Sequence, residues 1–103
     1  MIKRTLGVEY EIGKILSTRD DIEEAYIFGS YAKGRMDSAS DIDILVVGSF
    51  KIKEVQREIN NLSKKLGRTI NPVYMSMKEF KKRQIEKDSF VVNIFSDKYL
   101  KVI

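Results

Sequence analysis

The chain has 103 residues, carries 19 Lys and Arg against 15 Asp and Glu for a formal charge of +4, and contains neither Cys nor His. This composition excludes disulfides, thiolate and imidazole metal ligands, and histidine bases. A general base or metal ligand must therefore be a carboxylate, an amide, a Tyr, a Lys or water. The length predicts one domain over residues 1–103, because a chain of this size buries a single core.

The modest positive charge could attract a nucleotide, a nucleic acid or an acidic protein surface. Mixed charges at 33% of the residues are, however, typical of a solvated exterior. Nucleic-acid binding stays open but is not favoured, since no basic stripe is interleaved with stacking aromatic residues. No apolar run approaches the ~18 residues of a membrane span, and no signal-peptide core follows residues 1–4. We expect a soluble cytoplasmic protein without membrane contact.

Apolar residues at positions 8, 12, 15 and 16 predict an amphipathic packing helix from about Leu6 to Thr18. A polar turn follows, and Glu24 to Phe28 is predicted to form the first strand. That strand leads directly into a Gly-Ser pair.

Gly29 has no side chain, so a ligand can approach its backbone closely. Ser30 is suited to cap a short helix through Lys33, with Gly34 as its C-terminal stop. The free N–H groups at a helix start favour phosphate. The pattern therefore predicts a phosphate-binding turn after the first strand.

A second apolar strand begins at Asp41 and continues to Val47. Alternation along a strand places the side chains of Asp41 and Asp43 on the same side, about 6.6 Å apart, where both can hold one metal ion. Only ten residues separate Ser30 from Asp41, fewer than a parallel crossover needs. We therefore expect the chain to turn back, so that Gly29-Ser30 and the two carboxylates share one edge of the sheet.

The connection between these strands contains Lys33 and Arg35, which lie where triphosphate oxygens would lie in such a site. For these two residues, phosphate contact and plain solvent exposure stay open as alternatives. Asp37 is interpreted as a turn residue rather than a ligand, because Asp and Ser favour turns.

A Gly-Ser pair, ten intervening residues and Asp-x-Asp between two apolar strands, as in FGSYAKGRMDSASDIDILVV, resemble the DNA polymerase β type nucleotidyltransferase superfamily. The resemblance is strongest over residues 25–47 and extends more weakly to Tyr74. The short chain resembles the minimal nucleotidyltransferases. The resemblance implies an α+β fold, a two-layer α/β arrangement with a small mixed sheet, helices on one face and the active site at one sheet edge.

The resemblance also implies a function. Asp41 and Asp43 would hold Mg²⁺, while Gly29 and Ser30 would seat a nucleoside triphosphate, expected to be ATP, whose nucleoside monophosphate is transferred to an acceptor. Minimal members of the family often act with a separate helical HEPN protein, in some cases as the antitoxin that attaches AMP to a toxin. A HEPN partner or a homo-oligomer is therefore implied.

Apolar residues spaced three and four apart from Ile52 to Leu66 predict a helix packed on the sheet, which ends at Gly67. Residues 69–74 are predicted to form a third strand, parallel to the second. Asn71 should then fall close to Asp41 and Asp43. Pro72 favours an edge position for this strand, because it lacks a backbone donor.

Asn71 departs from the family pattern, since many members carry a third carboxylate on this strand. An amide oxygen can coordinate a hard cation but cannot accept a proton as a carboxylate does. Two hypotheses follow. The chain is a nucleotidyltransferase that works without the third acid, with Asn71 orienting a water or the acceptor, or it is a non-catalytic module that binds nucleotide and metal and acts by binding a partner.

Ser76 and Glu79 form a capping box that predicts a helix through about Lys87. Residues 88–95 can add a further helical turn with apolar contacts. Residues 99–103 are predicted to form a short final strand at the sheet edge.

Overall fold

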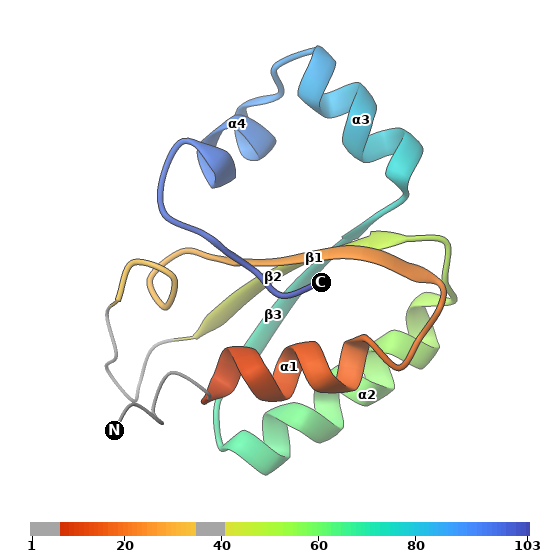
Figure 1. The fold of residues 1–103 in the computed structure, drawn as a ribbon, viewed down its shortest axis with the longest axis vertical. Coiled ribbons are helices and arrows are strands. Elements are labelled where there is room, and N and C mark those ends of the chain that lie inside the picture. The colour runs from red at the N-terminus through yellow and green to blue at the C-terminus, as the bar shows by residue number, and fades with distance from the viewer. Residues whose placement is uncertain (1–6, 35–40) are drawn as a thin grey trace.

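The computed structural model describes residues 7–34 and 41–103. Within these ranges the chain forms four helices and four strands, each close to a predicted element. In chain order they are α1 (Val8–Leu16), β1 (Ile22–Phe28), β2 (Ile42–Gly48), α2 (Ile52–Leu66), β3 (Ile70–Met75), α3 (Met77–Ile85), α4 (Ser89–Phe95) and β4 (Leu100–Lys101) (Figure 1).

The four strands form one mixed sheet in the order β3-β2-β1-β4. β1 pairs antiparallel with β2, as the short connection between them predicts, and β3 pairs parallel with β2. β4 is shorter than predicted and pairs antiparallel with the other side of β1. Pro72 therefore lies on an edge strand, where its missing N–H group interrupts no inner ladder.

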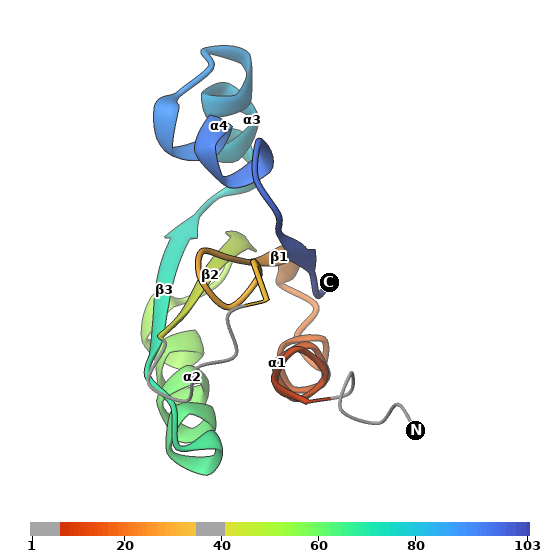
Figure 2. The ribbon, with the colours of Figure 1, turned by 90° about the vertical axis from the view of Figure 1, so that its left-hand side faces the viewer.

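Helices cover both faces of the sheet, so the α+β class is confirmed but the prediction of helices on one face is wrong. On one face, Ile44 and Val46 of β2 belong to an apolar cluster that includes residues of α1 and α2. On the other face, Leu45 belongs to a second cluster, with Phe80 of α3 and Ile94 of α4. Figures 1 and 2 show the two helix pairs on opposite sides of the strands.

The physical reason is that β2 is apolar on both faces. Ile42, Ile44, Leu45, Val46 and Val47 are all fully buried. A strand of this kind needs cover on each side. The C-terminal helices supply it on the second face, because α3 and α4 each carry apolar residues that turn inward.

α3 ends at Ile85 rather than continuing to Lys87. Lys87 has φ 55°, in the left-handed region, which stops the helix and redirects the chain into α4. Both C-terminal helices are capped by side chains. Ser76 Oγ accepts a hydrogen bond from the Glu79 N–H group at 3.0 Å, and Asp88 Oδ2 accepts one from Val91 N–H at 3.2 Å.

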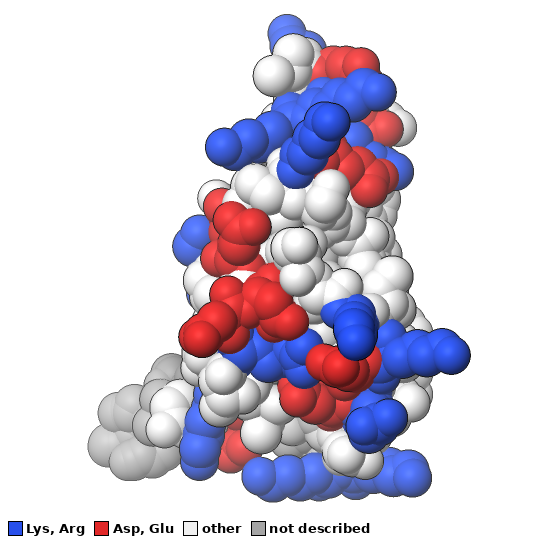
Figure 3. Space-filling model, turned by 90° about the vertical axis from the view of Figure 1, so that its right-hand side faces the viewer, with Lys and Arg blue, Asp and Glu red and all other residues white. Residues whose placement is uncertain are grey.

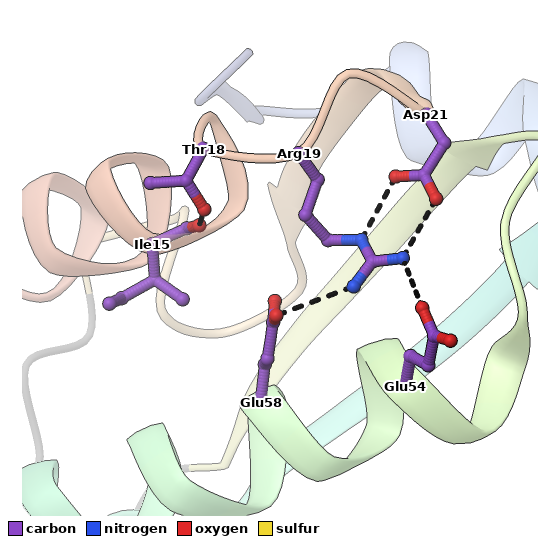
Figure 4. Close-up of polar contacts among 6 residues, drawn as sticks. All are labelled: Ile15, Thr18, Arg19, Asp21, Glu54 and Glu58. Atoms are coloured by element: carbon purple, nitrogen blue, oxygen red, sulfur yellow. Dashed lines mark hydrogen bonds and ion pairs between the residues drawn. The ribbon is translucent and has the colours of Figure 1, made fainter.

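Arg19 joins the α1–β1 turn to helix α2 (Figure 4). Its guanidinium bonds Asp21 at 2.7 and 2.9 Å, Glu54 at 2.9 Å and Glu58 at 3.3 Å. The bond from Arg19 lowers the pKa values of both Asp21 and Glu54. This network fixes the packing of α1 and α2 beneath the sheet.

Figure 3 shows the side of the molecule opposite to the one that faces the viewer in Figure 2. Acidic side chains are concentrated in the middle of this face, and Lys and Arg side chains surround them (Figure 3). None of the helices in the described ranges has the length and apolar character that a membrane span requires.

Candidate functional site

Three strand ends meet at one edge of the sheet, on the left in Figure 1 and facing the viewer in Figure 2. Asp43, the second residue of β2, pairs in register with Phe28, the last residue of β1. On its other side Asp43 pairs with Asn71, the second residue of β3. The predicted convergence of the Gly-Ser pair, the carboxylates and Asn71 at one sheet edge is confirmed.

The side chains of Asp41, Asp43 and Asn71 are in direct contact. Asn71 Nδ2 donates to Asp41 Oδ2 at 3.0 Å and to Asp43 Oδ1 at 3.3 Å. Asp41 is exposed just before β2, and Asp43 is half-buried. Two carboxylate oxygens therefore point at one position, and the neutral amide keeps them together without adding a third negative charge.

This donor set fits a hard divalent cation. Carboxylate and amide oxygens are the ligands that Mg²⁺ accepts in proteins, completed by water and substrate phosphate. The convergence of both carboxylates on one nitrogen shows that they can reach a common ligand. Among the described residues no group of three or more Asp, Glu, His or Cys side chains could hold a metal. Any ion here would depend on Asp41 and Asp43, with Asn71 as a neutral neighbour.

Gly29 lies directly against the carboxylate of Asp43. A Cβ atom at Gly29 would overlap Asp43 Oδ2, and the backbone of Gly29 has φ +78°. Both features exclude a side chain, because L residues rarely adopt this conformation and the carboxylate occupies the space. The glycine therefore brings the backbone of the turn into contact with the acidic pair.

The turn after Gly29 is a single turn and not the predicted short helix. Lys33 N–H donates to the carbonyl oxygens of Gly29 and Ser30, both at 3.2 Å, and Gly34 N–H donates to Tyr31 O at 3.1 Å. Gly34 has φ +82°, a left-handed conformation that glycine adopts readily and that suits its predicted place at the end of this segment. Ser30 is exposed at the sheet edge. Over residues 29–34 the prediction of a short helix is wrong, because these bonds close a single turn.

Lys33 forms an ion pair with the segment that follows α4. Its Nζ lies 3.0 Å from Asp97 Oδ2, and both side chains are about half exposed. The bond from Lys33, together with the Lys98 N–H group, holds the pKa of Asp97 below its usual value. Lys33 belongs to the turn after Gly29 and its partner in the structure is a carboxylate, so the phosphate contact of Lys33 stays a prediction. Arg35 and Asp37 lie outside the described residues.

Tyr31 anchors the turn, and the sequence analysis missed it. The side chain is 6% exposed within the core, its hydroxyl donates to Glu9 Oε1 at 2.7 Å, and the Arg68 guanidinium lies 5.3 Å from its ring centroid. Tyr31 and Ala32 are adjacent residues at the start of the connection, and both are buried. This pair of neighbouring apolar residues was the signal in the sequence that the start of the connection packs on the core.

The sequence model of the family described as Polymerase beta, Nucleotidyltransferase matches residues 10–98. The chain belongs to this family. The membership expected from the Gly-Ser and Asp-x-Asp spacing is therefore confirmed. The match begins within α1 and extends beyond α4, and it includes Gly29, Asp41, Asp43 and Asn71.

This family member is 38% identical over 65 residues to a Methanocaldococcus jannaschii protein provisionally named a protein adenylyltransferase. The alignment spans 63% of this chain and 65% of that relative. A chain in a crystal structure of a toxin–antitoxin with AMP-PNP has TM-score 0.57 at 23% identity, covering 85% of this chain and 84% of that one.

A second solved structure with the same fold contains tri-AMPylated Shewanella oneidensis HEPN toxin in complex with MNT antitoxin. The matching chain there has TM-score 0.50 at 20% identity, covering 86% of this chain and 82% of that one. At these identities the two structures show a shared fold, and they agree with the mixed sheet described here.

The contact between Gly29 and Asp43 predicts a specific cost for Gly29→Ala. Gly67→Ala is the matched control, since Gly67 also has positive φ, +66°, but a Cβ there meets nothing within 4 Å. The control should lose about 1–2 kcal/mol of unfolding free energy from backbone strain. Gly29→Ala should lose more in urea unfolding, because Asp43 must also move. Equal losses in the two variants would contradict the contact.

The buried hydroxyl of Tyr31 leads us to expect that the folded chain loses stability at alkaline pH. Burial, followed by the bond to Glu9, raises the pKa of Tyr31 from 10.0 to about 12. Because the pKa of Tyr31 is higher in the folded than in the unfolded chain, the protonated hydroxyl stabilises the fold fully below the unfolded pKa of 10.0. This stabilisation is lost as the pH rises from 10.0 towards about 12. In urea unfolding across this window, Tyr31→Phe should show a shallower decline than the parent chain. Tyr10→Phe, at an exposed tyrosine, should decline as the parent does.

Proposed function

We propose that this nucleotidyltransferase binds Mg²⁺ and a nucleoside triphosphate, ATP by preference, and transfers the nucleoside monophosphate to an acceptor. The observation that carries the proposal is the convergence of Asp41 and Asp43 on one position, with the Gly29 backbone against them. Family membership and the name of the archaeal relative support it.

Asp41 and Asp43 hold the cation. When bound, Mg²⁺ neutralises phosphate charge and favours in-line displacement. Gly29 lets the phosphates approach the turn closely, and Ser30 lies exposed beside them. Lys33 and Arg35 contact phosphate oxygens, which requires Lys33 to release Asp97. These residues place the reacting α-phosphorus at the sheet edge.

The transfer step replaces one bond at the α-phosphorus of the nucleotide by another. A nucleophilic oxygen of the acceptor forms a bond to the α-phosphorus, while the bond from that phosphorus to the oxygen bridging to the β-phosphorus breaks. Pyrophosphate leaves with the bonding electron pair, and the acceptor proton passes to solvent. Asn71 orients the acceptor or a water through its amide, because it cannot take the proton itself.

Loss of a third carboxylate lowers the rate without removing the basis of the reaction. General-base help is typically worth about 10²- to 10⁴-fold, whereas phosphoryl transfer depends mainly on positioning and charge stabilisation. Asp41 and Asp43 still provide the positions for the cation. A slow nucleotidyltransferase is therefore the function that the site supports best.

We further propose that the acceptor is a side chain of a helical HEPN partner protein, so that this chain acts as the antitoxin of a pair. The support is the shared fold with chains of toxin–antitoxin complexes, one of which contains AMPylated HEPN toxin. A homo-oligomer in which a second copy supplies the acceptor is the alternative. Intact mass of both proteins after reaction distinguishes these two acceptors.

The second candidate function is a non-catalytic module that neutralises its partner by binding. The hydrogen bonds from Asn71 favour it, because a neutral amide that bridges two carboxylates holds the acidic pair in place without any ion. Such a module would retain nucleotide and metal binding but transfer nothing.

The transfer test uses the purified chain, Mg²⁺, ATP and a candidate helical HEPN protein, followed by intact mass spectrometry. We expect the partner to gain the mass of one or more AMP groups. Asp41→Ala should abolish the gain, because the cation loses a ligand. Glu86→Ala, which removes an exposed carboxylate beyond α3, should leave it intact. A stable complex with an unmodified partner would contradict the enzyme and support the binding module.

Asn71→Asp should raise the rate of transfer, by up to the roughly 10²- to 10⁴-fold that a general base supplies. The new carboxylate would stand beside Asp41 and Asp43 and add a proton acceptor. Asn61→Asp makes the same charge change on the exposed surface of α2 and should have no effect. An unchanged rate in Asn71→Asp, with cation binding intact, would show that Asn71 does not occupy the third-acid position.

A further inference from the structure

We propose that the cavity between the end of β1, the Gly29 turn and α4 binds the nucleoside half of the nucleotide, and that Asn93 makes it prefer adenine. This inference rests on the proposed function, since it places the part of the substrate that the acidic pair does not hold. The cavity has a volume of about 140 Å³. Its lining residues are Phe28, Gly29, Lys33, Phe90, Asn93, Ile94, Asp97 and Lys98.

The cavity lies on the same side of the sheet as the carboxylates. Phe28, which lines it, is the register partner of Asp43. Side chains of such cross-strand partners share a face and have Cβ atoms about 4.5–5.5 Å apart. Gly29 touches both places, because it lines the cavity and abuts Asp43 Oδ2. A nucleotide with its phosphates at the acidic pair therefore has this cavity beside it.

The cavity offers an apolar floor for a ring. Phe28 and Phe90 are half-buried and meet edge to face, with centroids 5.8 Å apart, and Ile94 behind them is 4% exposed. A cavity of about 150 Å³ accommodates benzene. One ring of a base can therefore enter, while the rest of the nucleoside lies at the open side. Aromatic faces bind any base by stacking, so this floor gives affinity without selectivity.

Selectivity needs a polar group at the rim, and Asn93 supplies it. Asn93 lies on α4, is exposed, and lines the same cavity. Its amide carries a donor and an acceptor side by side, and this pair matches N6 and N7 of adenine in a bidentate contact. The neighbouring Asp97 carboxylate can accept a further bond from a ribose hydroxyl or an amino group.

The Lys33–Asp97 ion pair links this cavity to the phosphate side. Lys33 comes from the turn that follows β1, and Asp97 from the segment that follows α4. Both residues line the cavity, and their charged groups are 3.0 Å apart. A triphosphate at the turn would attract Lys33 away from Asp97. Release of Asp97 would then free its carboxylate for the nucleoside, so that phosphate and nucleoside binding support one another.

A larger cavity of about 670 Å³ lies elsewhere and does not serve this role. It is lined by the ends of β2 and β3, including Gly48 and Met75. Gly48 is five residues beyond Asp43 along β2, or about 17 Å at 3.3–3.4 Å per residue. The cavity beside Gly29 is therefore the one that a nucleotide held by Asp43 can reach.

The test measures binding of three probes to the full chain with Mg²⁺ by calorimetry: AMP-PNP, GMP-PNP and tripolyphosphate. The parent chain should bind AMP-PNP about tenfold more tightly than tripolyphosphate, as expected from one stacked base. Asn93→Trp fills the cavity and should remove that advantage while leaving tripolyphosphate affinity unchanged. Val92→Trp, the adjacent exposed position outside the cavity, should behave as the parent.

Asn93→Ala tests the base preference separately, because it removes the amide and leaves the space open. It should reduce the preference for AMP-PNP over GMP-PNP. Undiminished AMP-PNP binding by Asn93→Trp, or an unchanged preference in Asn93→Ala, would overturn the corresponding part of the inference. If the parent chain binds neither tripolyphosphate nor AMP-PNP, the proposed function fails and the inference with it. Tripolyphosphate binding without any gain from the nucleoside overturns the inference alone.

Discussion

The pairing of β2 with both of its neighbours determines the candidate site. Antiparallel pairing with β1 sets the Gly29 turn beside Asp43, and parallel pairing with β3 sets Asn71 on the other side of the same residue. A one-residue slip of β2 would exchange its two faces, each of which packs in its own apolar cluster, and would turn Asp43 away from Gly29. The packing that stabilises the sheet therefore also fixes the positions of the polar groups at its edge.

The site has two opposing requirements: the two carboxylates must lie close enough to share a cation, and their like charges repel. Two carboxylates close together repel one another, and in this chain a neutral amide donates to both of them. A third carboxylate would add a proton acceptor and a stronger cation ligand, but it would increase repulsion in the free protein. Asn71 therefore stabilises the acidic pair of the free protein. Gly29 contributes through its missing side chain, which lets the backbone of the turn lie against the Asp43 carboxylate.

The strand order near the site could be predicted from the sequence because it depends on the lengths of the connections between the strands. Ten residues between Ser30 and Asp41 exclude a crossover, and the helix before β3 returns the chain parallel to β2. The second helical layer did not follow, because periodicity shows that α3 and α4 have apolar faces but not which surface they cover. The Lys33–Asp97 pair and the bond from Tyr31 to Glu9 join residues distant in the sequence, and no local pattern indicates them.

The central claim is that a divalent cation binds between Asp41 and Asp43. Mn²⁺ tests it most directly, because bound Mn²⁺ broadens the amide signals of nearby residues in an NMR spectrum. We expect broadening centred on Gly29, residues 41–43 and Asn71, and its loss in Asp43→Asn. Broadening centred on the opposite ends of β2 and β3, or broadening that persists in Asp43→Asn, would contradict the account.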